Sequence, residues 1–165
     1  NGYSGSSMSY SQKYLWNYIN QPTASKVAIN TYADSASVKS DLMNSYAWDT
    51  AIVFIQECGY TNYANQSSKN SSLSNTGANN DEVCKINDMA SNLAEWTTEY
   101  ASSTSISYAN PCTSRGGDYY DNSNDCTASR YNLYYAAYSS INFRSTSQHL
   151  YVGLKIDRKA NKHKQ

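Results

Sequence analysis

The residues of this chain best suited to chemistry lie between Ser114 and Arg144 and are mostly tyrosine, asparagine, aspartate and serine. Tyrosine supplies a broad, rigid aromatic face, while serine and asparagine adapt their hydrogen bonds to many partners. These residue types are poor material for a hydrophobic core and are typical of binding loops. The stretch therefore predicts non-covalent recognition. The alternative interpretation is a tyrosine-rich polar surface loop without a ligand.

The predicted ligand face takes its members from both halves of this stretch. They are Asp118, Tyr119, Tyr120, Asp121, Asn122, Asn124, Tyr131, Asn132, Tyr134, Tyr135 and Tyr138. Side chains alternate between the two sides of an extended strand, so some members of the adjacent tyrosine pairs are expected to be half-buried. An aromatic, hydroxyl-rich face suits a protein epitope or a glycan, with a few aromatic residues supplying most of the binding energy.

Patterns typical of catalysis are missing from the sequence. His149 and His163 have no motif around them, and a lone histidine is usually a satisfied or solvated residue. The sequence contains no Gly-x-Ser-x-Gly, no His-Glu-x-x-His and no phosphate-binding loop. The carboxylates between Asp81 and Glu99 form no pair placed for acid–base work. The sequence therefore predicts a protein that is not an enzyme.

Four cysteines, Cys58, Cys84, Cys112 and Cys126, occur without a Cys-x-x-Cys pair, which argues against a zinc site or a thioredoxin-like motif. An even number suits two disulfides in an oxidising compartment. Of the three pairings we favour Cys58–Cys84 with Cys112–Cys126, because each bond then closes one polar loop. Four reduced, buried thiols are the alternative.

Length and charge narrow the class of protein further. A chain of 165 residues predicts a single domain, 1–165, with a sizeable core. Net charge is zero, yet the tail 155–165 is basic and the rest of the chain has more acidic than basic residues, which excludes a basic nucleic-acid face on the body. No membrane-spanning stretch or signal peptide is visible. Because the chain starts at Asn1, we expect a piece of a longer or processed protein.

The elements that must position these residues follow from periodicity and turn residues. Helical spacing predicts helices over 11–19 and 23–34 and a stronger one that is capped by Ser45 and stops at Gly59, followed by a long surface loop over 60–80. Short strands are expected at 83–86, 93–96, 133–137 and 150–156. The predicted class is α+β, with N-terminal helices, short antiparallel strands and long loops, and with Trp48 and Trp96 in the core.

Several segments resemble the formylglycine-generating enzyme (sulfatase-modifying factor) family. Residues 42–51, LMNSYAWDTA, are similar to its Leu-Pro-Thr-Glu-Ala-Glu-Trp-Glu-Tyr-Ala helix, and residues 87–97, NDMASNLAEWT, to its Asn-x-x-Gly-Asn-Val-Trp-Glu-Trp-Thr segment. Its closing Arg-Gly-Gly, Ala-x-Arg and Gly-Phe-Arg are paralleled at 115–117, 128–130 and 142–144. The resemblance implies an irregular C-type-lectin-like fold. The variable proteins of diversity-generating retroelements use that fold, and their hypervariable surface lies between Gly-Gly and Gly-Phe-Arg.

Departures from this family argue against its chemistry. The enzymes hold copper with two cysteines after Gly-Gly, and in this chain the first of those positions is Asp121 and only the second is a cysteine, Cys126. One thiolate cannot form a two-sulfur Cu(I) site. The family's Gly and Trp are also replaced by Ser91 and Ala94. A degenerate oxidase of this type therefore remains only an alternative to a binding protein.

The resemblance also implies a calcium site at Asp88, Ser91, Leu93 and Glu95, through carboxylate and backbone carbonyl oxygens of the kind that calcium prefers. The alternative is that Asp88 caps a turn and Glu95 binds buried backbone groups without a metal. No cofactor is required for binding, and a calcium-dependent lectin is the rival function. Arg115 and Arg144 are expected to hold backbone carbonyls of the irregular loops.

Together these observations predict a non-catalytic module that binds a surface protein or a glycan and makes no nucleic-acid contact. Neutral polar residues dominate its polarity, which fits an extracellular setting. We expect it on a bacterial cell surface, a pilus or a phage virion, attached to a larger surface or virion protein.

Overall fold

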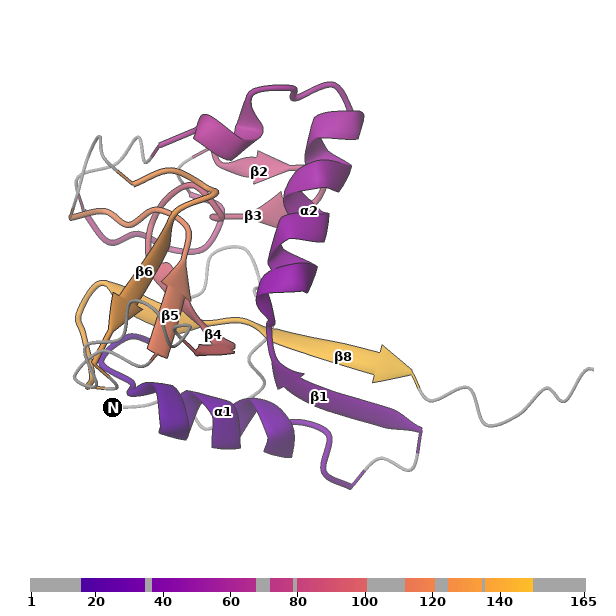
Figure 1. Ribbon diagram of the computed structural model, residues 1–165, viewed down its shortest axis with the longest axis vertical. Helices are drawn as coiled ribbons and strands as arrows, with labels where there is room; N and C mark the ends of the chain where they lie inside the picture. The colour runs from indigo at the N-terminus through magenta and orange to yellow at the C-terminus, as the bar shows by residue number, and fades with distance from the viewer. Residues whose placement is uncertain are drawn as a thin grey trace, which may run out of the picture.

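The computed structural model describes residues 16–34, 37–67, 72–78, 80–100, 112–120, 125–134 and 136–149. Figure 1 shows helices and short strands in a mixed arrangement. In chain order the elements are α1 (Gln21–Asn30), β1 (Val38–Leu42), α2 (Ser45–Glu57), the 3-10 helix η1 (Tyr63–Asn65), β2 (Glu82–Val83), β3 (Ile86–Asn87), β4 (Ala94–Tyr100), β5 (Cys112–Arg115), β6 (Arg130–Leu133), β7 (Ile141–Phe143) and β8 (Ser145–His149). The α+β class predicted from the sequence is confirmed.

Three small sheets organise these strands. The largest has the order β6-β5-β4-β7, in which β4–β5 and β5–β6 are antiparallel and β4–β7 is parallel. Strands β2 and β3 form a two-stranded hairpin. Strands β1 and β8 pair antiparallel, from Val38 opposite His149 to Leu42 opposite Ser145, in a ribbon that extends away from the body (Figure 1). The strand expected at 150–156 lies outside the described residues.

Both helices begin at asparagine side chains that bind free backbone N–H groups. Asn20 Oδ1 accepts a hydrogen bond from Thr23 N–H at 2.9 Å, and Asn44 Oδ1 accepts one from Ala47 N–H at 2.8 Å. The residue that caps α2 is thus Asn44, one position before the expected Ser45. Helix α2 ends just before Gly59, whose φ of +103° suits glycine. The helix expected over 11–19 is not seen in its described part, 16–19.

The core consists of two clusters, each built on one tryptophan. One lies between α1 and the large sheet and contains Trp96; the other lies between α2 and the β2–β3 hairpin and contains Trp48. Both indoles are fully buried, and each N–H donates to a backbone carbonyl at 2.9 Å, Trp48 to Thr127 and Trp96 to Ile19. The prediction that both tryptophans are core residues is confirmed. Among the described residues, none of the helices has the length and apolar character needed to span a membrane.

Candidate binding face

Neighbouring strands β5 and β6 differ sharply in exposure. All four side chains of β5 are buried, whereas Arg130, Tyr131 and Asn132 of β6 are exposed and only Leu133 packs inward. Strand β6 lies at the edge of the sheet, so its side chains border solvent while β5 is covered by its neighbours. A rigid, buried strand therefore supports an exposed one rich in groups that bind ligands.

Gly116 and Gly117 fix the turn that leaves β5 toward Tyr119 and Tyr120. Gly116 has a φ of +85°, and a Cβ there would lie 2.6 Å from the carbonyl oxygen of Met89. At Gly117 a Cβ would lie 2.5 Å from the carbonyl oxygen of Ala90. The close backbone approach expected of this glycine pair is thus present, and it holds the start of the loop against residues 89–90.

Four of the predicted ligand-face residues are exposed, and we call them the tyrosine face: Tyr120, Tyr131, Asn132 and Tyr134. Tyr120 is the most exposed of the three tyrosines, at 81%. The Tyr131 hydroxyl donates to the buried carboxylate of Asp125. The Asn132 side-chain oxygen accepts from the Thr113 hydroxyl at 3.2 Å. Tyr131 and Asn132 are therefore exposed, and hydrogen bonds to residues of the neighbouring chain segments hold their side chains in place.

Two predicted members of the face point elsewhere. Asp118 is buried, and its carboxylate accepts a hydrogen bond from the Tyr120 N–H at 2.8 Å. Tyr138 is half-buried in the core cluster of Trp96, with the two rings 6.1 Å apart. Asp118 therefore caps the loop, and one side of the Tyr138 ring packs against an indole, so neither side chain is fully exposed on this face.

The remaining members of the predicted face divide into one described and four undescribed residues. Tyr119 is half-buried, as expected for one member of an adjacent tyrosine pair, and its ring meets that of Tyr120 edge-on at 6.5 Å. Its N–H donates to the carbonyl oxygen of Asn92 at 3.0 Å. The other four predicted residues, Asp121, Asn122, Asn124 and Tyr135, lie outside the described residues.

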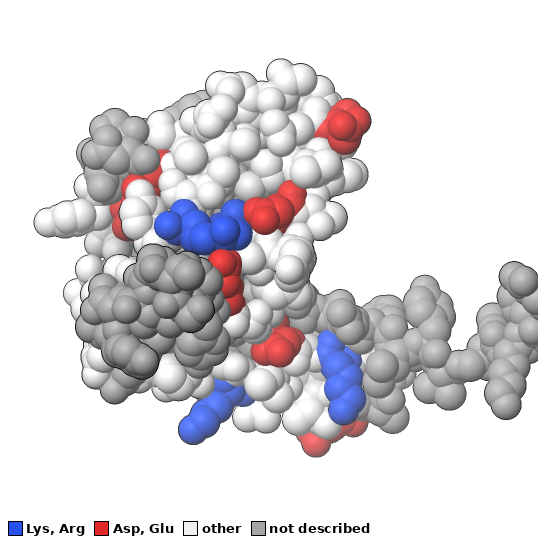
Figure 2. All heavy atoms as spheres, in the orientation of Figure 1, with Lys and Arg blue, Asp and Glu red and all other residues white. Residues whose placement is uncertain are grey.

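A chain of ion pairs joins strand β6 to α2, and no motif in the sequence indicates it. Arg115 Nη2 contacts Asp49 Oδ1 at 2.5 Å, and Arg130 Nε contacts Glu99 Oε2 at 3.2 Å. Arg130 also lies 3.9 Å from Asp49. Figure 2 shows basic and acidic side chains adjoining on this side of the molecule. The charges of this cluster compensate one another, so the face adjoins a charged but balanced surface.

Arg115 also performs the role expected of it. Its Nε donates to the carbonyl oxygen of Ser129 at 3.1 Å, which ties β5 to the residue before β6. The guanidinium carbon lies 5.9 Å from the centre of the Trp48 ring, a cation–π distance. Arg115 therefore connects the buried strand, the exposed strand and α2.

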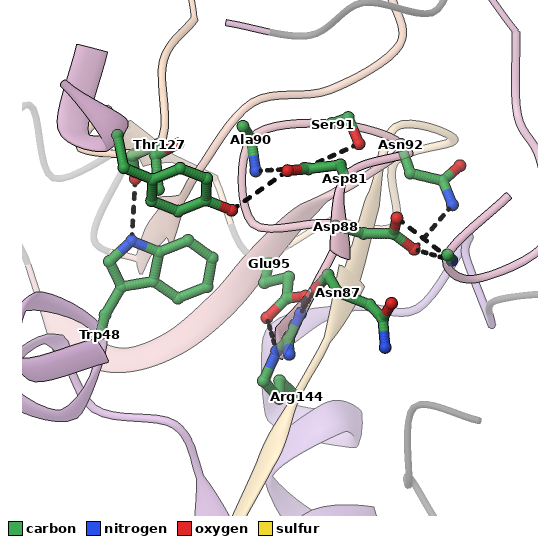
Figure 3. A network of polar contacts seen from close by, with 12 residues as sticks. Trp48, Asp81, Asn87, Asp88, Ala90, Ser91, Asn92, Glu95, Thr127 and Arg144 are labelled. Carbon is green, nitrogen blue, oxygen red and sulfur yellow. Dashed lines mark hydrogen bonds and ion pairs between the residues drawn. The ribbon is translucent and has the colours of Figure 1, made fainter. Parts of the chain in front are cut away.

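Arg144 and Glu95 form a buried ion pair beside the large sheet. Arg144 Nε and Nη2 donate to the Glu95 carboxylate at 2.9 and 2.8 Å, and Nη2 also donates to the Asn87 carbonyl oxygen at 2.7 Å (Figure 3). Such two-point pairing is the strong geometry for a guanidinium and a carboxylate. Arg144 thus holds one backbone carbonyl, at the end of β3 rather than in a loop, and its main partner is a carboxylate.

Asp81 and Asp88 organise the loops around the β2–β3 hairpin. Asp81 accepts hydrogen bonds from Ala90 N–H at 2.9 Å, from the Ser91 hydroxyl at 3.0 Å and from the Tyr63 hydroxyl at 3.2 Å (Figure 3). Asp88 accepts from Gly77 N–H at 3.0 Å. Burial raises the pKa of Asp88, although the bond from Gly77 opposes this shift. Both carboxylates bind loop groups.

The side chains at the expected calcium site have other partners or are buried. Asp88 binds Gly77, Ser91 donates to Asp81, Glu95 binds Arg144, and the Leu93 side chain is buried. Within the part of the chain that the structure describes, no three His, Cys, Asp or Glu side chains converge as metal ligands. The geometry agrees with a turn-capping role for Asp88, whereas the partner of Glu95 is a guanidinium.

All four cysteines are free thiols, and their positions separate the two expected disulfides. Cys112 is buried opposite Leu133 in the sheet, and Cys126 lies near the far end of β5, where the adjacent Asp125 approaches Gly117. Strand β5 alone separates the two by about 10 Å, beyond the roughly 7 Å limit between disulfide Cα atoms. The Cys112–Cys126 pairing was therefore wrong. Burial, followed by the influence of Cys58, raises the pKa of the Cys84 thiol.

Comparisons of this chain with protein-family models, with curated proteins and with solved structures find no match. The described residues themselves offer surface recognition: exposed aromatic rings, hydroxyls and an amide on a braced edge strand. Four of the buried ionisable groups, Asp81, Asp88, Glu95 and Arg144, are bound to backbone groups, to hydroxyls or to an opposite charge.

Proposed function

We propose that this chain is a non-catalytic ligand-binding module whose contact surface is the tyrosine face. The observation that carries the proposal is the exposure of β6 beside the wholly buried β5. A buried strand, a glycine turn without room for a Cβ and an ion-pair network support this surface from below. Such support lowers the entropy lost when the side chains are immobilised by a ligand.

The chemistry of the face supports a surface protein or a glycan as the ligand. Tyrosine rings supply a large contact area with only two side-chain torsions, and their hydroxyls add hydrogen bonds. The neighbouring charges of Asp49, Glu99, Arg115 and Arg130 pair with one another, so the face is not a basic surface of the kind that attracts nucleic acid. The neutral polar composition of the chain supports a location on a bacterial cell surface, a pilus or a phage virion, as part of a larger surface protein.

Because of the resemblance to variable proteins, we also propose that the tyrosine-rich stretch is diversified by a retroelement. If the tyrosine-rich stretch is diversified by a retroelement, its Tyr, Asn, Asp and Ser codons derive from AAC or AAT by changes at adenine, and a near-identical template repeat lies nearby. Sequencing the encoding locus tests this point. A locus without such a repeat would refute diversification and leave the binding function to be tested on its own.

A binding screen with matched variants tests the function. Wild-type protein, Tyr120→Ser, Tyr134→Ser and the control Tyr46→Ser are applied to arrays of bacterial surface proteins and of glycans. Tyr46 is a suitable control because it is 87% exposed on α2, outside the tyrosine face. We expect ligands of the wild type to lose at least about tenfold in affinity with the two face variants, since buried aromatic contacts supply most binding energy.

The control separates recognition from general stickiness. Tyr46→Ser is expected to bind as the wild type does, and all three variants are expected to keep its melting temperature. Equal losses for Tyr46→Ser, or full binding by both face variants, would contradict the proposal. Glycan binding abolished by EDTA would instead favour the calcium-dependent lectin.

A further inference from the structure

The ribbon formed by β1 and β8 has one open edge among the described residues. Figure 1 shows the ribbon extending away from the body, and its two strands form a sheet of their own. Helix α1 packs along β1, where the Ser40 hydroxyl donates to the Ala28 carbonyl oxygen. Strand β8 pairs with β1 on one side, and no described strand pairs with it on the other. The outer side of β8 is therefore the edge that another strand can join.

The register of the ribbon shows which backbone groups of β8 point to this edge. The N–H of Met43 donates to the carbonyl oxygen of Arg144 at 2.9 Å, so the backbone of Arg144 faces the β1 side. Successive residues of an antiparallel strand point their N–H and C=O groups alternately toward the partner strand and away from it. Those of Ser147 and His149 therefore point outward. The N–H of Leu42 agrees with this alternation, because it bonds to the side chain of the preceding residue rather than to β8.

The sequence of β8 lacks the features that usually protect an exposed edge. The strand reads Ser-Thr-Ser-Gln-His and contains no Lys, Asp, Glu or Pro. Charged residues and proline on edge strands discourage pairing with another chain. A two-stranded ribbon is also only marginally stable by itself, so further strands would stabilise it. Strand β8 is therefore suited to strand addition, in which an extended segment bonds to the backbone groups of a sheet edge.

We propose that β8 pairs with β8 of a second copy of this chain, antiparallel and centred on Ser147. In this register Ser147 lies opposite its own copy, and Ser145 lies opposite His149, the only ionisable side chain of the strand. No two charges of the same sign therefore face each other across the pair, which would destabilise it. The second copy is the fitting partner because an antiparallel pair of identical strands has two-fold symmetry, so one edge satisfies both molecules.

The resulting sheet would have the order β1-β8-β8-β1. In its centre the outward N–H and C=O groups of Ser147 in each copy would bond to those of the other copy. The dimer would carry two tyrosine faces, which raises the avidity for a ligand present in many copies on a surface. The pairing itself does not depend on what ligand the tyrosine face binds.

Sedimentation equilibrium of the full chain, over roughly a hundredfold range of concentration, tests the proposal. We expect a reversible equilibrium between monomer and dimer. Amide hydrogen exchange locates the contact: the N–H groups of Ser147 and His149 should be protected only where the dimer is populated. Those of Thr146 and Gln148 point toward β1, so their protection should not depend on concentration. A chain that stays monomeric, or a dimer that leaves exchange at residues 147 and 149 unchanged, would overturn the proposal.

Matched variants separate pairing through β8 from association through another surface. Proline is tolerated on an edge strand where its missing N–H would face solvent, so Ser147→Pro should keep the β1–β8 ribbon. Both copies lose an N–H donor, and self-association should weaken at least about tenfold relative to Ser147→Ala, which keeps the N–H. Thr146→Pro removes an N–H that points toward β1, so it should lower the melting temperature instead.

Equal self-association of Ser147→Pro and Ser147→Ala would refute pairing through β8. If Ser147→Pro does not fold, the exchange pattern of the wild-type chain decides the question, because it needs no variant.

Discussion

Replacing Arg144 by methionine should leave the Glu95 carboxylate buried without its counter-charge. Glu95 is only 3% exposed, and the guanidinium donates to both of its oxygens at 2.8 to 3.2 Å. Breaking a buried ion pair from one side costs about 3–5 kcal/mol of unfolding free energy, because the remaining charge keeps its desolvation penalty. Methionine retains much of the side-chain volume, so the loss of charge and hydrogen bonds dominates.

The Arg144→Met variant also loses a hydrogen bond to the backbone, which lowers its free energy of unfolding further. Arg144 Nη2 also donates to the Asn87 carbonyl oxygen at 2.7 Å, and methionine cannot replace that bond. At about 2–4 °C per kcal/mol for a chain of this size, the expected fall in melting temperature is roughly 6–20 °C. Urea unfolding at neutral pH, followed by tryptophan fluorescence, measures the free energy, since Trp96 neighbours Glu95 in β4.

A double-mutant cycle with Glu95→Gln separates the lost charge pairing from lost packing. The double variant Glu95→Gln/Arg144→Met removes the buried charge together with its partner, so it should be more stable than the sum of the single losses predicts, by about 1–3 kcal/mol. A loss below about 1 kcal/mol for Arg144→Met, or strictly additive losses in the cycle, would refute this reasoning.

Three other predictions concern the loops and the tyrosine face. Gly116→Ala should lower the free energy of unfolding in urea clearly more than Gly59→Ala does. Both glycines have a positive φ, of +85° and +103°, but only at Gly116 would the new Cβ lie 2.6 Å from a carbonyl oxygen. Equal costs would show that the close contact is unimportant. The free energy of unfolding of Tyr120→Ser should stay within about 0.5 kcal/mol of the wild type, whereas that of Tyr138→Ser should fall by more than about 1 kcal/mol, because only Tyr138 packs against the core. The reverse order would show that the assignment of Tyr120 to the exposed face is wrong. Burial raises the pKa of Asp88, so the folded state binds this proton more tightly than the unfolded state, and stability from this group falls as pH rises through the range between the two pKa values. Asp88→Asn should remove that fall, measured as melting temperature between about pH 4 and 8 against the wild type.

Local patterns in the sequence predicted the local elements well. Trp48, Ile52 and Ile55 recur at helical spacing, and all three are buried on one face of α2. The glycine pair 116–117 indicated a close backbone approach, and the structure has one. These features depend on residues a few positions apart, whose geometry is set by backbone torsions and by the period of the helix or strand.

Within the candidate site, the sequence identified the exposed residues but not all of their neighbours. Tyr120, Tyr131, Asn132 and Tyr134 were predicted and are exposed, whereas Asp118 and Tyr138 were predicted and point inward. Composition states which residue types can bind a ligand. It does not state on which side of a loop each one lies, and that depends on the elements packed against it.

Only the tertiary structure decided the long-range partners. Arg144 finds Glu95 49 positions earlier, and Arg115 finds Asp49 66 positions earlier, although no periodicity in the sequence links either pair. The separation of Cys112 from Cys126 likewise follows from the register of β5 with β6, because a spacing of 14 positions in the sequence does not state where the returning chain lies along β5. Such contacts depend on the path by which irregular loops bring distant segments back to the sheet. That path is stabilised by packing across the whole core, so the residues that finally meet do not determine it by themselves.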